Sequence, residues 1–136
     1  MGFLLSIIAL LLFAVIYILD EITMMAINVR NRKWFKITAK RKFNKALKVD
    51  VFANFLFFDF WNLVFSLGGY RFGVFGETLS SCLGKKKLEK SLSWVGLLFY
   101  YLLYGIDFRT WKKGGHCFAS IMTEKEIQGF LLLSKI

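Results

Sequence analysis

The run FLLSIIALLLFAVIYIL, residues 3–19, decides the fold class of this chain, because apart from Ser6 every residue in it is apolar or aromatic. A helix needs about 20 apolar residues to cross a bilayer, with ~17 at the lower end, and Gly2 and residues 22–29 can lengthen this one. No basic residue precedes the run, and no A-x-A cleavage site follows it. We therefore predict a transmembrane anchor over residues 1–29 that persists in the mature protein.

The composition of the whole chain also favours a membrane location. Of its 136 residues, 57% are hydrophobic and 18% aromatic, and the mean hydropathy is +0.53, well above soluble usage. The net charge of +10 attracts either nucleic acid or anionic lipid. Because the background is apolar and no nucleic-acid recognition element is recognisable, lipid is the expected partner. Proline is absent and glycine punctuates the chain, so we predict a mostly α-helical protein.

A basic arm at residues 30–49 predicts the orientation of the anchor. Nine Lys or Arg residues and no acid lie between Arg30 and Lys48. Positive charge beside a span stays cytoplasmic, so we expect the N-terminus outside and the bulk of the chain inside. Expected lipid contacts in the arm are Arg30, Arg32, Lys33, Trp34, Lys36, Lys40, Arg41 and Lys42, and further along the chain Lys85, Lys86, Lys87, Lys112 and Lys113.

Two more apolar segments predict that residues 50–136 form a helical module lying against the membrane. Residues 50–67 place Asp59, Asn62 and Ser66 on one helical stripe, which favours an interfacial or re-entrant helix. A full second span would bring Asp59 near the bilayer centre, at high cost. Residues 94–106 are too short for a span and suit a buried or surface-lying helix. Lysines and arginine on both flanks indicate contact with one anionic leaflet.

Local capping signals predict two further short helices. In GETLSSCLG, residues 76–84, Glu77 or Thr78 can cap a helix that Gly84 would end. Near the C-terminus, Thr123 and Glu126 have the spacing of a capping box ahead of a short amphipathic helix.

Polar residues gather on both sides of residues 94–106, and the two groups could converge in space. The candidate site residues are Glu77, Ser80, Ser81, Cys82, Asp107, His116 and Cys117. One interpretation is a thiol nucleophile, with Cys82 activated by His116 and the imidazole oriented by Glu77 or Asp107.

Two other interpretations use the same residues. One is a zinc site formed by His116, Cys117, Cys82 and a carboxylate, for which the C-x-x-C spacing is missing. In a buried polar network, His116 would donate to a carboxylate, Cys117 would pack as a small apolar residue, and Glu77 would bind backbone amides or Arg109. No complete catalytic, metal or cofactor signature is present, so we expect no cofactor and no metal, and enzymatic activity stays open but is disfavoured.

The pattern formed by Trp61-Asn62, Gly68-Gly69, GETLSSCLG, Asp107 and GHCFASI resembles a group of small proteins encoded in bacteriophages and prophages. Those proteins share an asparagine and glycine pair, an ETLSSR-like stretch, a hydrophobic segment with an aspartate, and an HC pair followed by a serine. The match covers residues 59–126, and this chain has Cys82 where arginine is frequent in the group. The resemblance implies a phage or prophage origin and a polar site of unknown use. With the predicted anchor and basic arm, we expect the chain in the bacterial inner membrane.

These features predict a phage- or prophage-encoded membrane accessory protein that acts through protein and lipid contacts, for example in superinfection exclusion or lysis control. The expected partners are a bilayer with anionic lipids, another membrane protein or a second copy of the chain, and not nucleic acid. A holin-like permeabilising protein is one alternative. A membrane-bound enzyme acting on a lipid or lipid-linked substrate through the polar residues is another.

Overall fold

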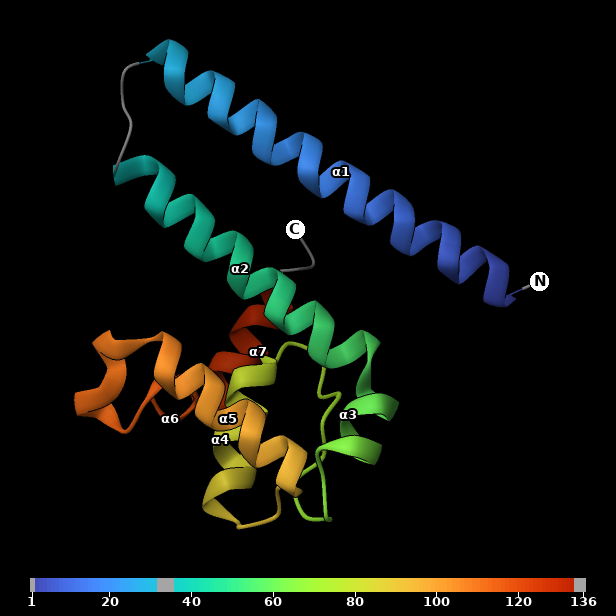
Figure 1. Ribbon diagram of the computed structural model, residues 1–136, viewed down its shortest axis with the longest axis vertical. Helices are drawn as coiled ribbons and strands as arrows, with labels where there is room; N and C mark the ends of the chain where they lie inside the picture. Colours follow the sequence, from blue (N-terminus) through green and yellow to red (C-terminus); the bar gives the residue numbers. More distant parts are fainter. Residues whose placement is uncertain (1, 32–35, 134–136) are drawn as a thin grey trace. The chain divides into compact units, whose positions relative to one another are not determined.

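The computed structural model describes residues 2–31 and 36–133, and within these residues it is mostly helical with no strand (Figure 1). The predicted mostly α-helical class is confirmed. In chain order the helices are α1 (Gly2–Asn31), α2 (Lys36–Leu56), α3 (Phe58–Val64), α4 (Leu79–Leu88), α5 (Trp94–Ile106), the 3-10 helix η1 (Phe108–Lys113), α6 (His116–Ala119) and α7 (Glu124–Leu133).

The chain divides into two compact units, residues 1–43 and 44–136. The first unit contains α1 and the beginning of α2. Helix α1 is continuous over 30 residues. Its stretch Gly2–Arg30 reaches a mean hydropathy of 2.9, and none of its most apolar part is buried against the rest of the protein. By length and composition it could therefore cross a membrane. In the part of the chain that the structure describes, no other helix passes this test.

The basic arm is helical for much of its length, because α2 begins at Lys36 and continues into the second unit. Arg30, Arg41 and Lys42 are exposed. Of the other arm residues predicted to contact lipid, Arg32, Lys33 and Trp34 lie outside the described residues, as do the side chains of Lys36 and Lys40.

We predicted one helix over residues 50–67. The structure instead has the end of α2 followed by α3. The chain leaves helical geometry at Phe57, with φ −108° and ψ 28°. The break serves a tertiary pairing: Asn62 accepts from the Phe72 backbone N–H at 3.1 Å and donates to the Phe72 carbonyl oxygen at 3.1 Å. Asn62 therefore faces protein, whereas Asp59 is exposed.

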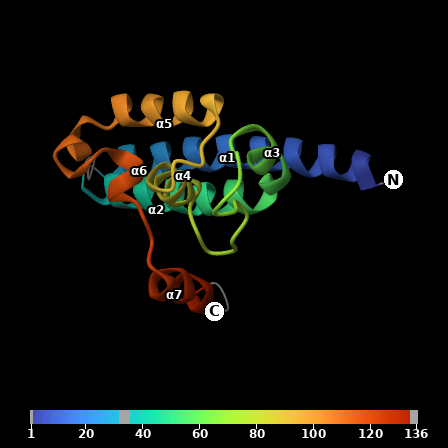
Figure 2. The same cartoon turned by 90° about the horizontal axis from the view of Figure 1, so that it is seen from below.

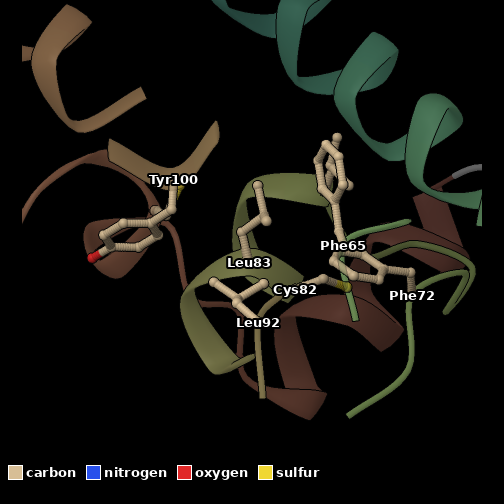
Figure 3. Packing of buried hydrophobic residues seen from close by; sticks show 8 residues of the cluster. Phe65, Phe72, Cys82, Leu83, Leu92 and Tyr100 are labelled. Atoms are coloured by element: carbon tan, nitrogen blue, oxygen red, sulfur yellow. The ribbon is translucent and has the colours of Figure 1, made fainter. Parts of the chain in front are cut away.

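Helix α4 is central in the second unit, with α5 on one side and α7 on the other (Figure 2). Its buried side chains form the core together with residues of the flanking segments (Figure 3). The buried core residues are Phe65, Phe72, Leu79, Cys82, Leu83, Leu92, Tyr100 and Cys117.

The prediction that Gly84 ends its helix is wrong. Helix α4 continues through Gly84 to Leu88, and a Cβ at Gly84 would overlap the carbonyl oxygen of Cys117 in α6. This glycine therefore allows α4 and α6 to approach closely instead of terminating α4.

The other local signals give the predicted result. Helix α5 has the bounds of the predicted segment, and Ser93 caps it by accepting from the Gly96 backbone N–H. Thr78, not Glu77, caps α4 by accepting from the Ser81 backbone N–H at 3.1 Å. The capping box before α7 is confirmed, since the Thr123 backbone N–H donates to Glu126 Oε2 at 2.7 Å.

Candidate functional site

The two polar groups of the sequence do converge, at the N-terminal end of α4. His116 Nε2 lies 3.4 Å from Ser80 Oγ, and His116 Nδ1 lies 2.9 Å from Asp107 Oδ2. Ser80 Oγ also donates to Asp50 Oδ2 at 2.9 Å. The result is a line of four side chains, Asp50, Ser80, His116 and Asp107, which we call the polar line. Asp50 was missed as a site residue, although an acid at the start of the apolar stretch of α2 is a signal for a buried partner.

A glycine pair places His116 in this line. Gly114 and Gly115 have φ of 88° and 94°, a region that disfavours side chains, and they turn the chain from η1 into α6. A Cβ at Gly115 would also overlap the ring of Tyr104. The glycines before the HC pair therefore act by bringing His116 back against α4.

The direction of the hydrogen bonds along the polar line follows from the available protons. The Ser80 hydroxyl has one proton, and at 2.9 Å its donation to Asp50 is the shorter of its two contacts. The roles of the two His116 nitrogens in their contacts with Ser80 and Asp107 depend on the tautomer of the ring.

The two carboxylates of the line differ in their electrostatics. The hydrogen bond from His116 holds the pKa of Asp107 below its ordinary value. Burial raises the pKa of Asp50, and the hydrogen bonds from Ser80 oppose this effect only in part.

The order serine, histidine, aspartate is also that of a serine nucleophile with its base and orienting acid. Two contacts weaken that chemistry here. The Ser80 proton is donated to Asp50, and the Ser80 backbone N–H is directed to the same carboxylate, at 3.4 Å. A helix N-terminal amide engaged in this way is not free to stabilise an oxyanion. The polar line therefore suits positioning better than catalysis.

A second polar group surrounds Glu77, which is fully buried. Its carboxylate accepts from Ser81 Oγ at 2.6 Å and from Tyr70 Oη at 2.5 Å, and it pairs with Lys85 Nζ at 2.7 Å. The predicted partners, backbone amides or Arg109, are therefore wrong. Arg109 instead pairs with Asp107, Nε to Oδ1 at 3.5 Å.

The neighbours of Glu77 have shifted pKa values. Burial and the hydrogen bond to Glu77 raise the pKa of Tyr70 to about 12. For Lys85, burial lowers the pKa, but the bonds to Glu77 and Tyr70 outweigh burial, so that the pKa is raised and the ammonium ion persists. Lys85, in the last turn of α4, is thus held as an ammonium ion by Glu77, which lies just before the helix.

Asn54 of α2 is a further site residue that sequence reasoning missed. It is fully buried, and its Nδ2 donates to the Glu77 carbonyl oxygen at 2.9 Å and to Cys82 Sγ at 3.4 Å. Its Oδ1 accepts from the Gly73 backbone N–H at 3.1 Å. Asn54 thereby holds the loop before α4 against α2.

The structure contradicts the thiol and zinc interpretations. Cys82 and Cys117 are free and buried. Burial, together with the charge of Glu77, raises the pKa of Cys82, and burial raises the pKa of Cys117 to about 12. His116 bonds Ser80 and Asp107 instead of Cys82. Among the described residues, no group of three or more His, Cys, Asp and Glu side chains is placed to hold a metal ion.

Two of the lysines expected at lipid headgroups are used inside the fold. Lys86 is fully buried, with Nζ donating to the Gly68 carbonyl oxygen and lying 5.5 Å from the centre of the Phe72 ring. Burial lowers the pKa of Lys86. Its predicted lipid contact is therefore wrong, and the Lys85 ammonium is held by Glu77 and Tyr70. Lys87 reaches Tyr101 Oη at 3.1 Å, and Lys112 and Lys113 are exposed.

Helix α5 carries an exposed apolar face, which we call the α5 face. It consists of Trp94, Leu98, Tyr101, Leu102 and Ile106, with Phe108 directly after the helix. These helical positions recur at the three- and four-residue spacing of one helix face. Lys87 and Lys90 precede the α5 face, and Arg109, Lys112 and Lys113 follow it.

A scan against protein-family models and searches of curated proteins and solved structures found no match to this chain.

Proposed function

We propose that this chain is a membrane-anchored accessory protein whose second unit lies on an anionic leaflet through the α5 face. The observation that carries the proposal is the exposure of this face. Trp94 is 77% exposed, Leu98 65% and Ile106 68%. Contiguous apolar patches of this kind mark interaction surfaces, because water solvates them poorly.

The charges around the α5 face favour a bilayer as the covering partner. Cations stand at both ends of the helix, where an interfacial helix meets headgroups. Each Lys or Arg near an anionic surface contributes about 1 kcal/mol of attraction. Trp94 and Tyr101 are residue types enriched at that depth of the membrane.

The anchor and its orientation complete the proposal. Helix α1 would cross the bilayer, and the basic arm after it would stay on the cytoplasmic side with the second unit. The resemblance to phage and prophage proteins supports the bacterial inner membrane and a role in modulating the host envelope. In this role the polar line and the Glu77 group fix the shape of the unit that presents the α5 face.

The test uses the full-length chain in lipid nanodiscs, with a single environment-sensitive fluorophore attached at Leu98→Cys in a background lacking the native cysteines. We expect blue-shifted emission in discs containing phosphatidylglycerol and a smaller shift in phosphatidylcholine alone. The matched control is Gln128→Cys, an exposed position of α7, which should report water in both discs. Equal, water-like emission from both labels would overturn the docking proposal.

A lipid hydrolase is the second candidate, favoured by the distances from His116 to Ser80 and Asp107. A serine activated by this pair would react with a fluorophosphonate probe. Covalent labelling of the full-length chain that is lost in Ser80→Ala would raise this candidate above the accessory role. We expect no labelling, because Ser80 donates to Asp50. A collapse of membrane potential on expression would instead favour the holin-like alternative.

A further inference from the structure

We propose that a pocket at the C-terminal end of α5 holds one anionic phospholipid of the leaflet, with an acyl chain on the apolar wall and the phosphate at Arg109. This inference rests on the proposed docking of the α5 face and names the lipid that the docked unit selects.

The pocket is open and has a volume of about 440 Å³. It is lined by Leu103, Ile106, Asp107, Phe108, Arg109 and His116. The lining therefore combines three apolar side chains with three polar ones. This combination suits a ligand that is itself apolar at one end and polar at the other.

The pocket continues the α5 face. Ile106 and Phe108 belong to both, and they are 68% and 70% exposed. A lipid in the leaflet under this face could place a chain on Leu103, Ile106 and Phe108 without leaving the membrane. The continuity points to a membrane lipid as the occupant.

The charges in the pocket select an anionic headgroup. Asp107 is its one acid, and both carboxylate oxygens already have partners, His116 Nδ1 at 2.9 Å and the Arg109 guanidinium, through Nε, at 3.5 Å. The Arg109 side chain is 82% exposed, so its guanidinium can donate to a phosphate while Nε lies beside Asp107. Lys112 and Lys113, on the same 3-10 helix, add positive charge. A choline headgroup would bring another cation into this surrounding.

The experiment measures lipid retained by the full-length chain after purification from an equal mixture of phosphatidylglycerol and phosphatidylcholine, by native mass spectrometry. We expect one phosphatidylglycerol per chain. Arg109→Gln should weaken its retention about tenfold, which corresponds to one charge-assisted contact. Ile106→Asn should weaken retention of both lipids by removing part of the wall. Circular dichroism verifies that each variant is folded.

A matched control separates the pocket from the rest of the surface. Lys125→Gln removes an exposed cation of α7, outside both the pocket and the α5 face. This variant should retain the lipid like the wild type. Equal lipid retention by Arg109→Gln and Lys125→Gln, or no preference for phosphatidylglycerol, would overturn the proposal that the pocket binds an anionic lipid.

The outcomes of the two experiments are distinguishable. A blue-shifted Leu98 label without a retained lipid would leave docking standing and remove the pocket. A retained phosphatidylglycerol with a water-exposed Leu98 label would remove the docking proposal instead.

Discussion

Ser80 and His116, 36 residues apart in the sequence, meet with Oγ and Nε2 separated by 3.4 Å. Through this contact α6 is held against the N-terminal end of α4, while His116 also reaches Asp107 after α5. The histidine is therefore a junction that joins α6 both to α4 and to the residue that follows α5.

Replacing this junction should destabilise the fold. In His116→Ala, Asp107 loses the donor to its carboxylate and Ser80 loses one contact. We expect the free energy of unfolding to fall by about 1–2 kcal/mol, in the range for a lost hydrogen bond at a partly exposed site. Thermal unfolding of the detergent-solubilised chain measures the change. A melting temperature equal to that of Gln128→Ala, an exposed control, would contradict a stabilising role for His116.

Glu77→Gln should have a larger effect. The change keeps the shape of the side chain but leaves Lys85 without its anion inside the fold. Breaking a buried ion pair costs about 3–5 kcal/mol, and the partial exposure of Lys85 places the expected loss near the lower value. Denaturant unfolding compares it with Glu124→Gln, on the exposed side of α7, for which we expect a change within about 0.5 kcal/mol. Similar stabilities for the two variants would show that the Glu77 pair does not support the fold.

Two glycine substitutions should act with opposite signs. Gly84→Ala adds a Cβ against the carbonyl oxygen of Cys117, and backbone cannot move aside easily. Gly129→Ala adds a Cβ in α7 with nothing within 4 Å, where alanine favours helix by roughly 0.5–1 kcal/mol. We expect a lower melting temperature for the first variant and a higher one for the second. Equal increases would mean that α4 and α6 are less closely packed than described.

The two cysteines should resist alkylation in the folded chain. Both are buried, and their raised pKa values leave little thiolate at pH 8. Iodoacetamide followed by intact-mass measurement should add no label before denaturation and two labels after it. Rapid labelling of Cys82 in the folded chain would revive the nucleophile interpretation.

Low pH should weaken the contribution of Asp107 to the stability of the fold. Because the hydrogen bond from His116 lowers its pKa below 3.8, the ionised carboxylate stabilises the fold, and this stabilisation is lost as the pH falls through the lowered value. The difference in melting temperature between the wild type and Asp107→Asn should therefore shrink below about pH 4. The comparison with the variant cancels the opposite effect of Asp50, whose pKa is raised. A constant difference down to pH 2 would contradict the assignment.

Features set by neighbouring residues could be predicted from the sequence. The long apolar helix, the bounds of residues 94–106 and the capping box at Thr123 and Glu126 all depend on contacts within one or two helical turns. The burial of Cys117 and the pairing of His116 with a carboxylate were foreseen as one open alternative, because each residue type has a strong general preference.

Only the tertiary structure decided which distant groups meet. The break at Phe57, the burial of Lys86 and the partners of Glu77 depend on residues of other elements, as do the roles of Asp50 and Asn54. In the sequence, a glycine that ends a helix cannot be told from one that lets another helix pack closely, as Gly84 does. The physical reason is that a buried polar group or a close approach is stabilised by its partner across the fold, and sequence spacing does not specify that partner.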